Sequence, residues 1–491
     1  MGEFEIKLHV PRERLAQVKA GVQRGGARRE RLRARYFDTA DGALARHRIG
    51  LRLRQEGDAW VQTAKTEGDG LLHRAEHNVA LEPGDEAAVQ VRRHHGSEAG
   101  KALARALRKA GDDALSEVYR TDVERTRRDL GTGTTIVEVA LDVGTIRAGR
   151  RKVEVCEIEF ELKAGSREAA VELAQQWCDK YGLWLDTASK AMRGERLARG
   201  LRVAPATAFE PPRLTRRMGA HEVARAVAGA ALRQALGNAS EIARGVWDDE
   251  HVHQMRVGLR RLRTALREFD ALEPLASEAE VEVLATAFRE LGRQRDMACL
   301  QPALLAKMRE DGAPRLPLPR PEDVAPDPGS VARDPRLQAV LLQLLGRVSA
   351  APAGDEAGPR AVRKHIEHRL EKLHRRVVAE AASFAGLPHD EQHALRKRFK
   401  RLRYLAEAVA PLYPAGKVKA FIDELKPVQD ALGEYQDEWI AGQYWHSRTA
   451  QEPGAWFAVG WLNARRAQGA ARCDEACRCY GKRARPFWKA R

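Results

Sequence analysis

The sequence predicts an α+β chain with more than one domain, in which a β-rich N-terminal part is followed by an all-helical C-terminal part. Residues 1–165 contain several short runs in which polar and apolar residues alternate, such as Glu3-Phe4-Glu5-Ile6-Lys7-Leu8, and a period of two is typical of strands. Beyond residue 213, long segments rich in Ala, Leu, Arg and Glu favour helices. A length of 491 residues also exceeds what one hydrophobic core normally supports.

Prolines mark the boundary between the two parts. Pro205, Pro211 and Pro212 lie where the strand pattern stops and before the helical pattern begins. We therefore predict a first domain at residues 1–202, a linker at 203–215 and a second domain at 216–491. Within the second domain, residues 312–330 and 350–359 are rich in Pro, Gly or Ala, which predicts two loops.

The net charge of the chain indicates a polyanionic partner. The 85 Lys and Arg residues exceed the 69 Asp and Glu residues, which gives a formal charge of +16 and a pI near 9.7. A nucleic acid, an anionic membrane surface and a phosphorylated small molecule all fit such a surface. Charge alone does not distinguish between them.

The N-terminus and the cysteines predict a cytoplasmic protein. Charged residues follow Met1 at once, so no secretory signal is expected, and no apolar stretch is long enough to span a bilayer. Cys473, Cys477 and Cys479 lie close together and could bind a metal. Because no second Cys or His pair stands at zinc-ribbon spacing nearby, reduced thiols are the preferred interpretation.

The predicted strands of the first domain each have one charged face, and the sign of the charge differs between strands. The acidic runs contain Glu3, Glu5, Glu157, Glu159 and Glu161. The basic runs contain Arg52, Arg54, Lys65 and Arg125. An open antiparallel sheet with this face in water is one explanation. A solvated face normally mixes the two signs, however, so the segregation favours a closed barrel whose acidic and basic walls face each other.

Such an interior needs bound ions. Enclosed like charges repel each other and are costly to remove from water. A substrate with several negative charges would neutralise the basic wall, and divalent cations would neutralise the acidic wall. The pattern therefore indicates a metal–polyphosphate complex as the occupant.

At the N-terminus, Glu3-Phe-Glu5-Ile-Lys7 resembles the ExExK signature of the CYTH superfamily, the triphosphate tunnel metalloenzymes. Similar blocks follow in the family's order: Tyr36-Phe37-Asp38-Thr39, Leu51-Arg52-Leu53-Arg54, Thr63-Ala64-Lys65, Val137-Glu138-Val139-Ala140-Leu141-Asp142 and Ser189-Lys190-Ala191. The resemblance implies an eight-stranded antiparallel tunnel that hydrolyses triphosphate-containing substrates with Mg²⁺ or Mn²⁺.

Carried over by position, the resemblance assigns residues to both walls of the tunnel. The metal ligands would be Glu3, Glu5, Glu157 and Glu159, with Asp142 and Glu161 as further candidates. The catalytic residues that clamp the phosphates would be Lys7, Arg52, Arg54, Lys65, Arg125 and Lys190. Additional tunnel-lining candidates are Arg74, Glu76 and Glu138. These residue types suit phosphoryl transfer, which depends mainly on positioning and on neutralising the charge of phosphate oxygens.

An arginine-rich segment runs from Arg24 to Arg35 and departs from the rest of the first domain. Its simpler interpretation is a solvated basic helix or loop. The alternative is an added patch that steers anions towards a tunnel mouth.

The second domain contains an internal repeat. His253-Gln-Met-Arg256-Val-Gly-Leu-Arg260-Arg261-Leu262-Arg263 matches His393-Ala-Leu-Arg396-Lys-Arg-Phe-Lys400-Arg401-Leu402-Arg403 position for position. Leu291-Gly292 and Leu432-Gly433 follow the two copies at nearly the same interval. We therefore predict a duplicated helical unit, built as two packed bundles related by a pseudo-twofold axis.

On a helix, each copy of the repeat forms one basic stripe. The two stripes contain His253, Arg256, Arg260 and Arg263, and His393, Arg396, Lys400 and Arg403. A solvent-exposed basic helix would explain one copy, but duplication favours a site for a chain of phosphates. Specific nucleic-acid recognition is not expected, because aromatic residues for base stacking are sparse and no DNA-binding module is recognisable.

Residues 215–490 resemble the CHAD domain, with the two His/Arg blocks as the firmest part of the match. This resemblance implies two four-helix bundles around a basic groove or pore, binding of long-chain polyphosphate and association with polyphosphate granules. No membrane partner is expected.

Three functions are compatible with these features. The favoured one is a divalent-metal-dependent inorganic triphosphatase that the helical domain recruits to polyphosphate. The second is a granule-associated scaffold with little turnover, and the third is nucleotide cyclisation or thiamine triphosphate hydrolysis in the same tunnel. A P-loop NTPase is excluded, because the chain lacks a Gly-x-x-x-x-Gly-Lys-Ser/Thr loop.

Overall fold

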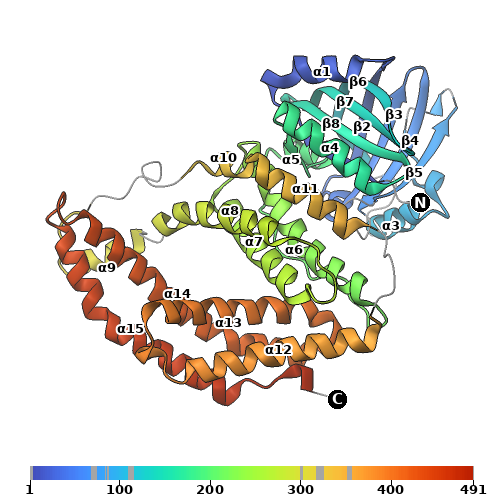
Figure 1. Ribbon diagram of the computed structural model, residues 1–491. Coiled ribbons are helices and arrows are strands. Elements are labelled where there is room, and N and C mark those ends of the chain that lie inside the picture. The colour runs from blue at the N-terminus through green and yellow to red at the C-terminus, as the bar shows by residue number, and fades with distance from the viewer. Residues whose placement is uncertain are drawn as a thin grey trace. The chain divides into compact units, whose positions relative to one another are not determined.

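A computed structural model describes residues 4–67, 74–82, 84–85, 88–108, 115–298, 302–316, 326–350 and 357–489. The chain forms two compact units (Figure 1). The sheet unit consists of Met1–Thr207, Ala235–Met255 and Ala332–Ala351. The helical unit consists of Ala208–Gln234, Arg256–Val331 and Pro352–Arg491. The predicted boundary at residue 202 is close to the end of the first segment, but two later segments also join the sheet unit.

The sheet unit is built on one antiparallel sheet. Its strands are β1 (Glu5–His9), β2 (Arg28–Thr39), β3 (Ile49–Glu56), β4 (Ala59–Glu67), β5 (Arg74–Leu81), β6 (Leu115–Thr132), β7 (Thr135–Ala148), β8 (Arg151–Ala164) and β9 (Trp184–Leu185). They lie in the order β5-β4-β3-β2-β6-β7-β8-β1-β9, and every neighbouring pair is antiparallel. The predicted antiparallel sheet with flanking helices is therefore confirmed.

Three details of the prediction differ from the structure. The sheet has nine strands instead of eight. Within the described ranges, β5 and β9 are its two edge strands and do not pair with each other, so the sheet is not closed. The extra strand, β9, has only two residues, which is too short for any alternation to show. The segment Arg24 to Arg35 is also not a helix or loop. Most of it is strand β2, whose pairing with β6 decides its conformation.

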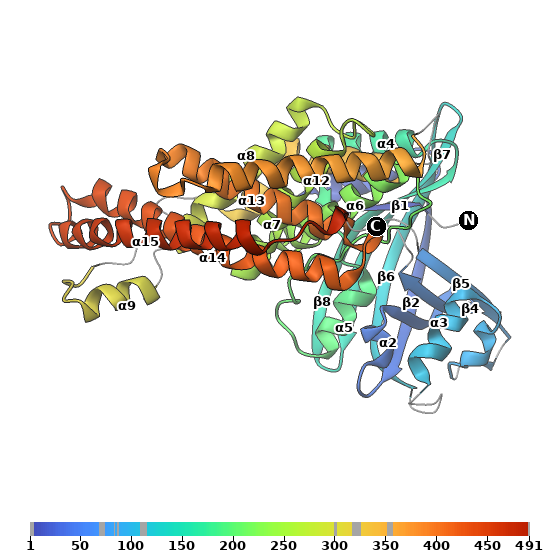
Figure 2. The same ribbon diagram turned by 90° about the horizontal axis from the view of Figure 1, so that it is seen from below.

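Helices cover the sheet on both faces. The helices of this unit are α1 (Leu15–Gln23), α2 (Ala43–Arg46), α3 (Glu98–Leu107), α4 (Arg167–Tyr181), α5 (Lys190–Ala198) and α11 (Pro335–Ser349). Helix α4 packs on β1, β7 and β8, where Trp177 meets Phe160 edge to face, and α11 packs on α4. Helices α2 and α3 lie beside β3, β4 and β5 (Figure 2). Helix α5 contacts β6, β7 and β8 from the face opposite to Phe160.

The helical unit confirms that the repeat is helical. The remaining helices are α6 (Ala220–Ala243), α7 (Asp249–Phe269), α8 (Glu278–Ala298), α9 (Pro302–Glu310), α10 (Pro328–Ala332), α12 (Pro359–Ala381), α13 (His389–Val409), α14 (Ala415–Arg448) and α15 (Ala455–Arg483). The repeat helices α7 and α13 each have 21 residues, and His253 and His393 are the fifth residue of their helices. None of the described helices combines the length and apolarity needed to cross a bilayer.

A buried histidine connects the 3-10 helix Val91–His94 to the sheet. Gln62 on β4 is fixed by the backbone of Gln90, which donates to its Oε1 at 2.9 Å and accepts from its Nε2 at 2.8 Å. The same Nε2 lies 2.9 Å from Nε2 of His94, which must therefore accept the hydrogen bond. His94 is then protonated on Nδ1 and donates to Nδ1 of His77, 3.0 Å away. Both rings must be neutral for this arrangement.

The unfolding free energy of the sheet unit is expected to fall as the pH is lowered from about 6.5 to about 4. Burial lowers the pKa of His94 to about 4, from an ordinary value of 6.5. The unfolded chain therefore takes up a proton in this window that the folded chain does not, which removes stability on the order of 3 kcal/mol. Denaturant titrations at a series of pH values would measure this loss. His94→Gln should be less stable at pH 7 but lose less on acidification, whereas the exposed neighbour His95→Gln should behave like the parent; an unchanged slope in His94→Gln would contradict the assignment.

Candidate active site

The register of the sheet places the predicted charges on one face. Directly opposed residues in an antiparallel sheet point to the same side. Asp142 on β7 is opposed to Arg125 on β6 and to Glu157 on β8. Glu159, two residues further along β8, is opposed to Lys7 on β1. These five side chains therefore share the face that is opposite to the α4 side.

The same register continues through the basic strands. Tyr119, which has the parity of Arg125, is opposed to Tyr36 on β2. Tyr36 is opposed to Arg52 on β3, and Arg52 is opposed to Thr63 on β4. Lys65 is two residues further along β4 and therefore points to the same side as Thr63. Of the predicted site residues, this face holds Glu5, Lys7, Arg52, Arg54, Lys65, Arg125, Glu157 and Glu159.

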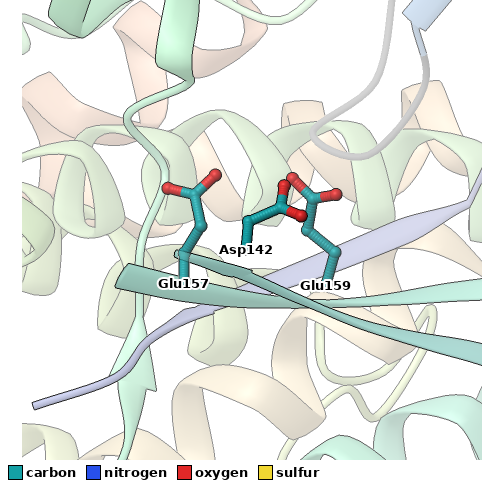
Figure 3. Close-up of side chains that lie close together, drawn as sticks. All are labelled: Asp142, Glu157 and Glu159. Atoms are coloured by element: carbon teal, nitrogen blue, oxygen red, sulfur yellow. The ribbon is translucent and has the colours of Figure 1, made fainter. Parts of the chain in front are cut away.

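Three carboxylates form a compact cluster on this face. Asp142, Glu157 and Glu159 each offer an oxygen, and these oxygens all lie within 4.8 Å of one another. Figure 3 shows the three groups pointing to the same side of the strands. Asp142 and Glu157 are fully buried. We refer to these residues as the carboxylate triad.

Two cations neutralise the carboxylate triad from different elements. The ammonium of Lys190, the first residue of α5, lies 2.6 Å from Asp142, 2.5 Å from Glu157 and 2.9 Å from Glu159. The guanidinium of Arg125 donates two hydrogen bonds of 2.7 Å to Asp142 and also contacts Glu159. Burial alone would lower the pKa of Lys190, but the surrounding carboxylates raise it well above its usual value.

The electrostatic balance keeps Glu159 ionised. Burial alone would raise the pKa of this carboxyl, but Lys190 and Arg125 hold it well below its usual range. Two more cations approach Glu157: the guanidinium of Arg193 at 3.2 Å and the ammonium of Lys7 at 3.9 Å. Four cations thus surround the three carboxylates, and Asp186 and Glu5 add further negative charge beside Lys7, Arg193 and Arg125.

The chemistry of the donors in the carboxylate triad fits Mg²⁺ or Mn²⁺. Both ions prefer hard oxygen ligands, and all three triad residues provide carboxylate oxygens. Of the predicted metal ligands, Glu157 and Glu159 belong to the triad, and Asp142 joins them. Glu5 is opposed to Glu161 in the register and is not part of the cluster in the described structure. Glu3 lies outside the described residues.

A separate group of charges forms the basic wall on β3, β4 and β5. The ammonium of Lys65 lies 2.7 Å from Glu76, and the guanidinium of Arg52 lies 3.7 Å from the same carboxylate. Burial would raise the pKa of Glu76, but Lys65 and Arg52 lower it to about 2. Arg52 also donates to the hydroxyl of Tyr36 at 3.2 Å, and Arg54 contacts Glu56.

The other tunnel-lining candidates are distributed differently. Glu138 is buried and lies 2.7 Å from Arg127 and 3.8 Å from Lys163. The side chain of Arg74 lies outside the described part of the structure. Sequence reasoning missed Arg127 and Arg193, although both repeat a spacing: Arg127 follows Arg125 by two residues on a strand, and Arg193 follows Lys190 by three on a helix.

Basic residues of α7 and α13 lie near each other within the helical unit. Burial lowers the pKa of Lys397 on α13, and the guanidinium groups of Arg260 and Arg263 on α7 lower it further. Arg261 of α7 also lies 2.5 Å from Glu407 of α13. Cations of the two repeats therefore lie close enough to repel each other.

Individual residues of the stripes differ in their surroundings. Arg256 is buried, with its guanidinium 4.9 Å from the ring of Phe288 and 3.3 Å from the carbonyl of Gly292. Arg260 lies over the same ring at 4.6 Å. His393 lies 3.0 Å from the side-chain oxygen of Gln436.

The other members of the stripes are paired within the protein or partly buried. Arg403 forms an ion pair with Glu407 at 2.6 Å and a hydrogen bond with Gln429 at 3.1 Å, so part of its charge is neutralised within the protein. The partly buried members on α7 and α13 are His253, Arg263, Arg396 and Lys400.

An inorganic triphosphatase of Haemophilus influenzae is 32% identical over 163 residues, which cover 32% of this chain and 44% of that protein. The chain thus spans less than half of that relative. A Mycobacterium tuberculosis protein described as uncharacterized is 29% identical over 492 aligned positions, covering 91% of this chain and 88% of the relative.

Among solved structures, the CHAD domain of the plant Ricinus communis is 25% identical and has a TM-score of 0.47, covering 57% of this chain and 98% of that one. Family models match residues 1–194 as a CYTH domain and residues 226–446 as a CHAD domain. The chain therefore combines a CYTH domain at residues 1–194 with a CHAD domain at residues 226–446.

Proposed function

We propose that the sheet unit hydrolyses inorganic triphosphate to pyrophosphate and phosphate with Mg²⁺ or Mn²⁺, and that the helical unit binds long-chain polyphosphate. The observation that carries the proposal is the carboxylate triad, which shares one sheet face with a row of arginines and lysines. Binding alone would not require clustered carboxylates beside a polyanion. The match to an inorganic triphosphatase supports the choice of substrate.

In the proposed reaction, the basic wall and the charges around the carboxylate triad have different roles. Lys65, Arg52 and Arg54 bind phosphate oxygens on the basic wall, while Arg125 and Lys190 neutralise charge next to the carboxylate triad. The oxygen of a water molecule joins the terminal phosphorus as one P–O–P bond breaks, and pyrophosphate leaves. When bound, a divalent ion held by the triad supplies charge neutralisation and activation of water.

One observation favours a second function, a polyphosphate-binding scaffold with little turnover. The ammonium of Lys190 lies within hydrogen-bonding distance of all three triad residues, so the acidic wall is already neutralised by the protein. A divalent ion has to compete with this internal cation. If the protein is an enzyme, the ammonium of Lys190 moves from the carboxylates to the phosphates of the substrate when the divalent ion binds. If it is a scaffold, this ammonium remains paired with the carboxylate triad.

Phosphate release separates the two functions. The full-length protein is incubated with tripolyphosphate, ATP or thiamine triphosphate, each with Mg²⁺, with Mn²⁺ or with EDTA. The triphosphatase proposal expects metal-dependent release that is fastest with tripolyphosphate. Absence of turnover with all three substrates would overturn it in favour of the scaffold.

The proposed location is the cytoplasm, in association with polyphosphate granules. The basic stripes of α7 and α13 would supply this association. Co-localisation of the full-length protein with stained granules, and its loss when the stripe cations are removed, would test it.

A further inference from the structure

Helix α5 carries three cations in succession, and each faces a different partner. Lys190 and Arg193 contact the carboxylate triad, as described above. Arg196, one turn further along, lies 2.8 Å from Glu241 at the C-terminal end of α6. Both members of this pair are largely buried, so the contact is not a solvent-screened surface pair. The flank of α5 that does not touch the triad is therefore fixed by α6.

The loop that leads into α5 is fixed by the residue before Glu241. The hydroxyl of Ser240 donates to Oδ1 of Asp186 at 2.9 Å and accepts from the backbone N–H of Thr187 at 3.1 Å. The same Oδ1 accepts the backbone N–H of Ala188 at 2.9 Å. Ser240 and Asp186 are both buried, so these bonds are shielded from water. One hydroxyl thus closes the turn from which Lys190 projects two residues later.

The same loop also fixes a cation on the opposite side. The backbone N–H of Asp186 donates to the carbonyl of Lys7 at 3.0 Å, and the ammonium of Lys7 in turn contacts the carbonyl of Ala188. A shift of the loop would therefore move Lys7 and Lys190 together. Both ammonium groups are next to Glu157.

From this geometry we infer that Ser240 and Glu241 of α6 are positioning residues for Lys190 and Arg193 in the active site. The inference rests on the proposed function. Both residues lie in Ala235–Met255, a segment that belongs to the sheet unit although it follows the first 207 residues by a stretch of the helical unit. The CYTH site is then completed by a helix that lies inside the stretch matched as CHAD. Neither residue touches the triad, so each acts through α5 and its preceding loop.

When Ser240 is replaced by alanine, we expect the loop before α5 to shift, while the sheet stays folded. Ser240→Ala leaves the N–H of Thr187 without an acceptor, but Asp186 keeps the hydrogen bond from Ala188. The loop can recover the lost bonds by moving towards water, since an unsatisfied buried group is costly. Such a movement changes the position of Lys190 without unfolding the sheet. A misplacement on the scale of 1 Å is enough to lower turnover about 10- to 100-fold.

A matched control lies on the same helix. Asn238 is fully buried on α6 and makes two hydrogen bonds to the backbone of Thr207, at 3.0 and 2.9 Å. Asn238→Ala therefore removes at least as many buried hydrogen bonds as Ser240→Ala, and both of its hydrogen bonds to Thr207 are separate from the loop before α5. The two variants are expected to lose similar stability in thermal unfolding. Only Ser240→Ala is expected to lose kcat for tripolyphosphate, by about 10-fold or more, and Ser240→Thr, which keeps the hydroxyl, should regain most of it.

Hydrogen exchange gives a readout that does not depend on turnover. In full-length Ser240→Ala, peptides that cover residues 186–193 should exchange faster than in the parent, while peptides from β6 and β7 should be unchanged. In Asn238→Ala, residues 186–193 should be protected as in the parent. Equal losses of kcat in both alanine variants, or unchanged exchange of residues 186–193 in Ser240→Ala, would overturn the inference.

A double variant separates this inference from the proposed function. If Ser240 acts mainly through Lys190, Ser240→Ala should lower kcat much less in the Lys190→Ala background than in the parent, and the remaining loss would come from Lys7 and Arg193, which the same loop and α5 position. A full additional loss would show that Ser240 acts elsewhere. If Lys190→Ala alone hydrolyses tripolyphosphate at the parental rate, the proposed active site fails, while the hydrogen-exchange result still decides whether Ser240 positions the loop.

Discussion

Glu157→Gln is expected to lower metal-dependent hydrolysis of tripolyphosphate by at least about 1000-fold, the largest activity loss predicted for this chain. Glu157 is fully buried, contacts Lys190 and Arg193 and belongs to the carboxylate triad. Glutamine has nearly the same shape but no charge, so it weakens the hold on a divalent ion while the neighbouring cations remain. Steady-state phosphate release at saturating Mg²⁺ and Mn²⁺ measures the loss.

Stability has to be measured with activity in this variant. Removing one partner from a buried ion cluster leaves the others uncompensated, which typically costs about 3–5 kcal/mol. Thermal unfolding should therefore show a lower midpoint for Glu157→Gln, and the assay has to be run well below it. A divalent ion should raise the midpoint of the parent more than that of the variant, because ligands stabilise the state they bind.

Glu154→Gln provides the control on the same strand. Glu154 is largely exposed and its carboxylate pairs with Arg12 at 3.2 Å, away from the triad. Its replacement should leave both turnover and unfolding close to those of the parent. Parental activity in Glu157→Gln, at a temperature where it is folded, would remove the carboxylate triad from the proposed mechanism.

The shared face of Glu157 and Arg52 could be predicted from the sequence because side-chain alternation in a strand has a strict period of two. Strands with one charged face place those charges together whenever they pair in one sheet. The register places these charges on one face over seven strands, from β1 to β4 by way of β8, β7, β6, β2 and β3. Parity is a local property, so the sequence carries it directly.

The family resemblance named Asp142 only as a further candidate for metal binding, and strand parity alone did not place it in the carboxylate triad. Both Glu138 and Asp142 of β7 have the parity of the inner face, and only the register decides which of them lies beside Glu157. That register runs unbroken from Val137 to the pair of Ala148 and Arg151 beside the β7–β8 turn, and the irregularity between Ile136 and Val137 lies outside it. Strand parity alone does not locate this turn, so it does not separate Glu138 from Asp142.

The role of α6 in the sheet unit was hidden for a related reason. Ser240 and Glu241 are ordinary polar residues in a helix, and nothing in the sequence near them indicates that they contact residues 186, 187 and 196. The contact depends on how the chain returns to the sheet after the predicted linker. In α7 and α13, likewise, the repeat predicted the cations but not that Glu407 would pair with Arg261 and Arg403.

The second large effect is expected in the helical unit, where Arg260→Ala with Lys397→Ala should weaken binding of long-chain polyphosphate and reduce its dependence on salt. The slope of log affinity against log salt concentration should become shallower by about 0.7 for each charge removed, as for single-stranded polyanions. Arg260 and Lys397 are the better choice over Arg256, because Arg256 is buried and donates to the carbonyl of Gly292, whereas Arg260 is partly exposed and Lys397 is exposed. Polyphosphate titrations at several salt concentrations measure both effects.

A matched pair of arginines on α12 controls for net charge. Arg375 and Arg376 are exposed and pair within their helix with Glu371 and Glu380. Replacing both by alanine removes the same charge from the chain but none from the stripes. The affinity and salt slope of this variant should therefore be much closer to those of the parent than those of the stripe variant.

Stability without polyphosphate should change in the opposite direction to affinity. Burial and the guanidinium groups of Arg260 and Arg263 lower the pKa of Lys397, which means that the folded state holds this ammonium against repulsion. Removing Arg260 and Lys397 relieves that repulsion, so the ligand-free variant should be at least as stable as the parent, while polyphosphate should raise its unfolding midpoint less. A surface selected for solubility alone would show no such exchange of stability for affinity. If the variant is less stable without ligand and binds polyphosphate as tightly as the parent, the cations of α7 and α13 are not a polyanion site.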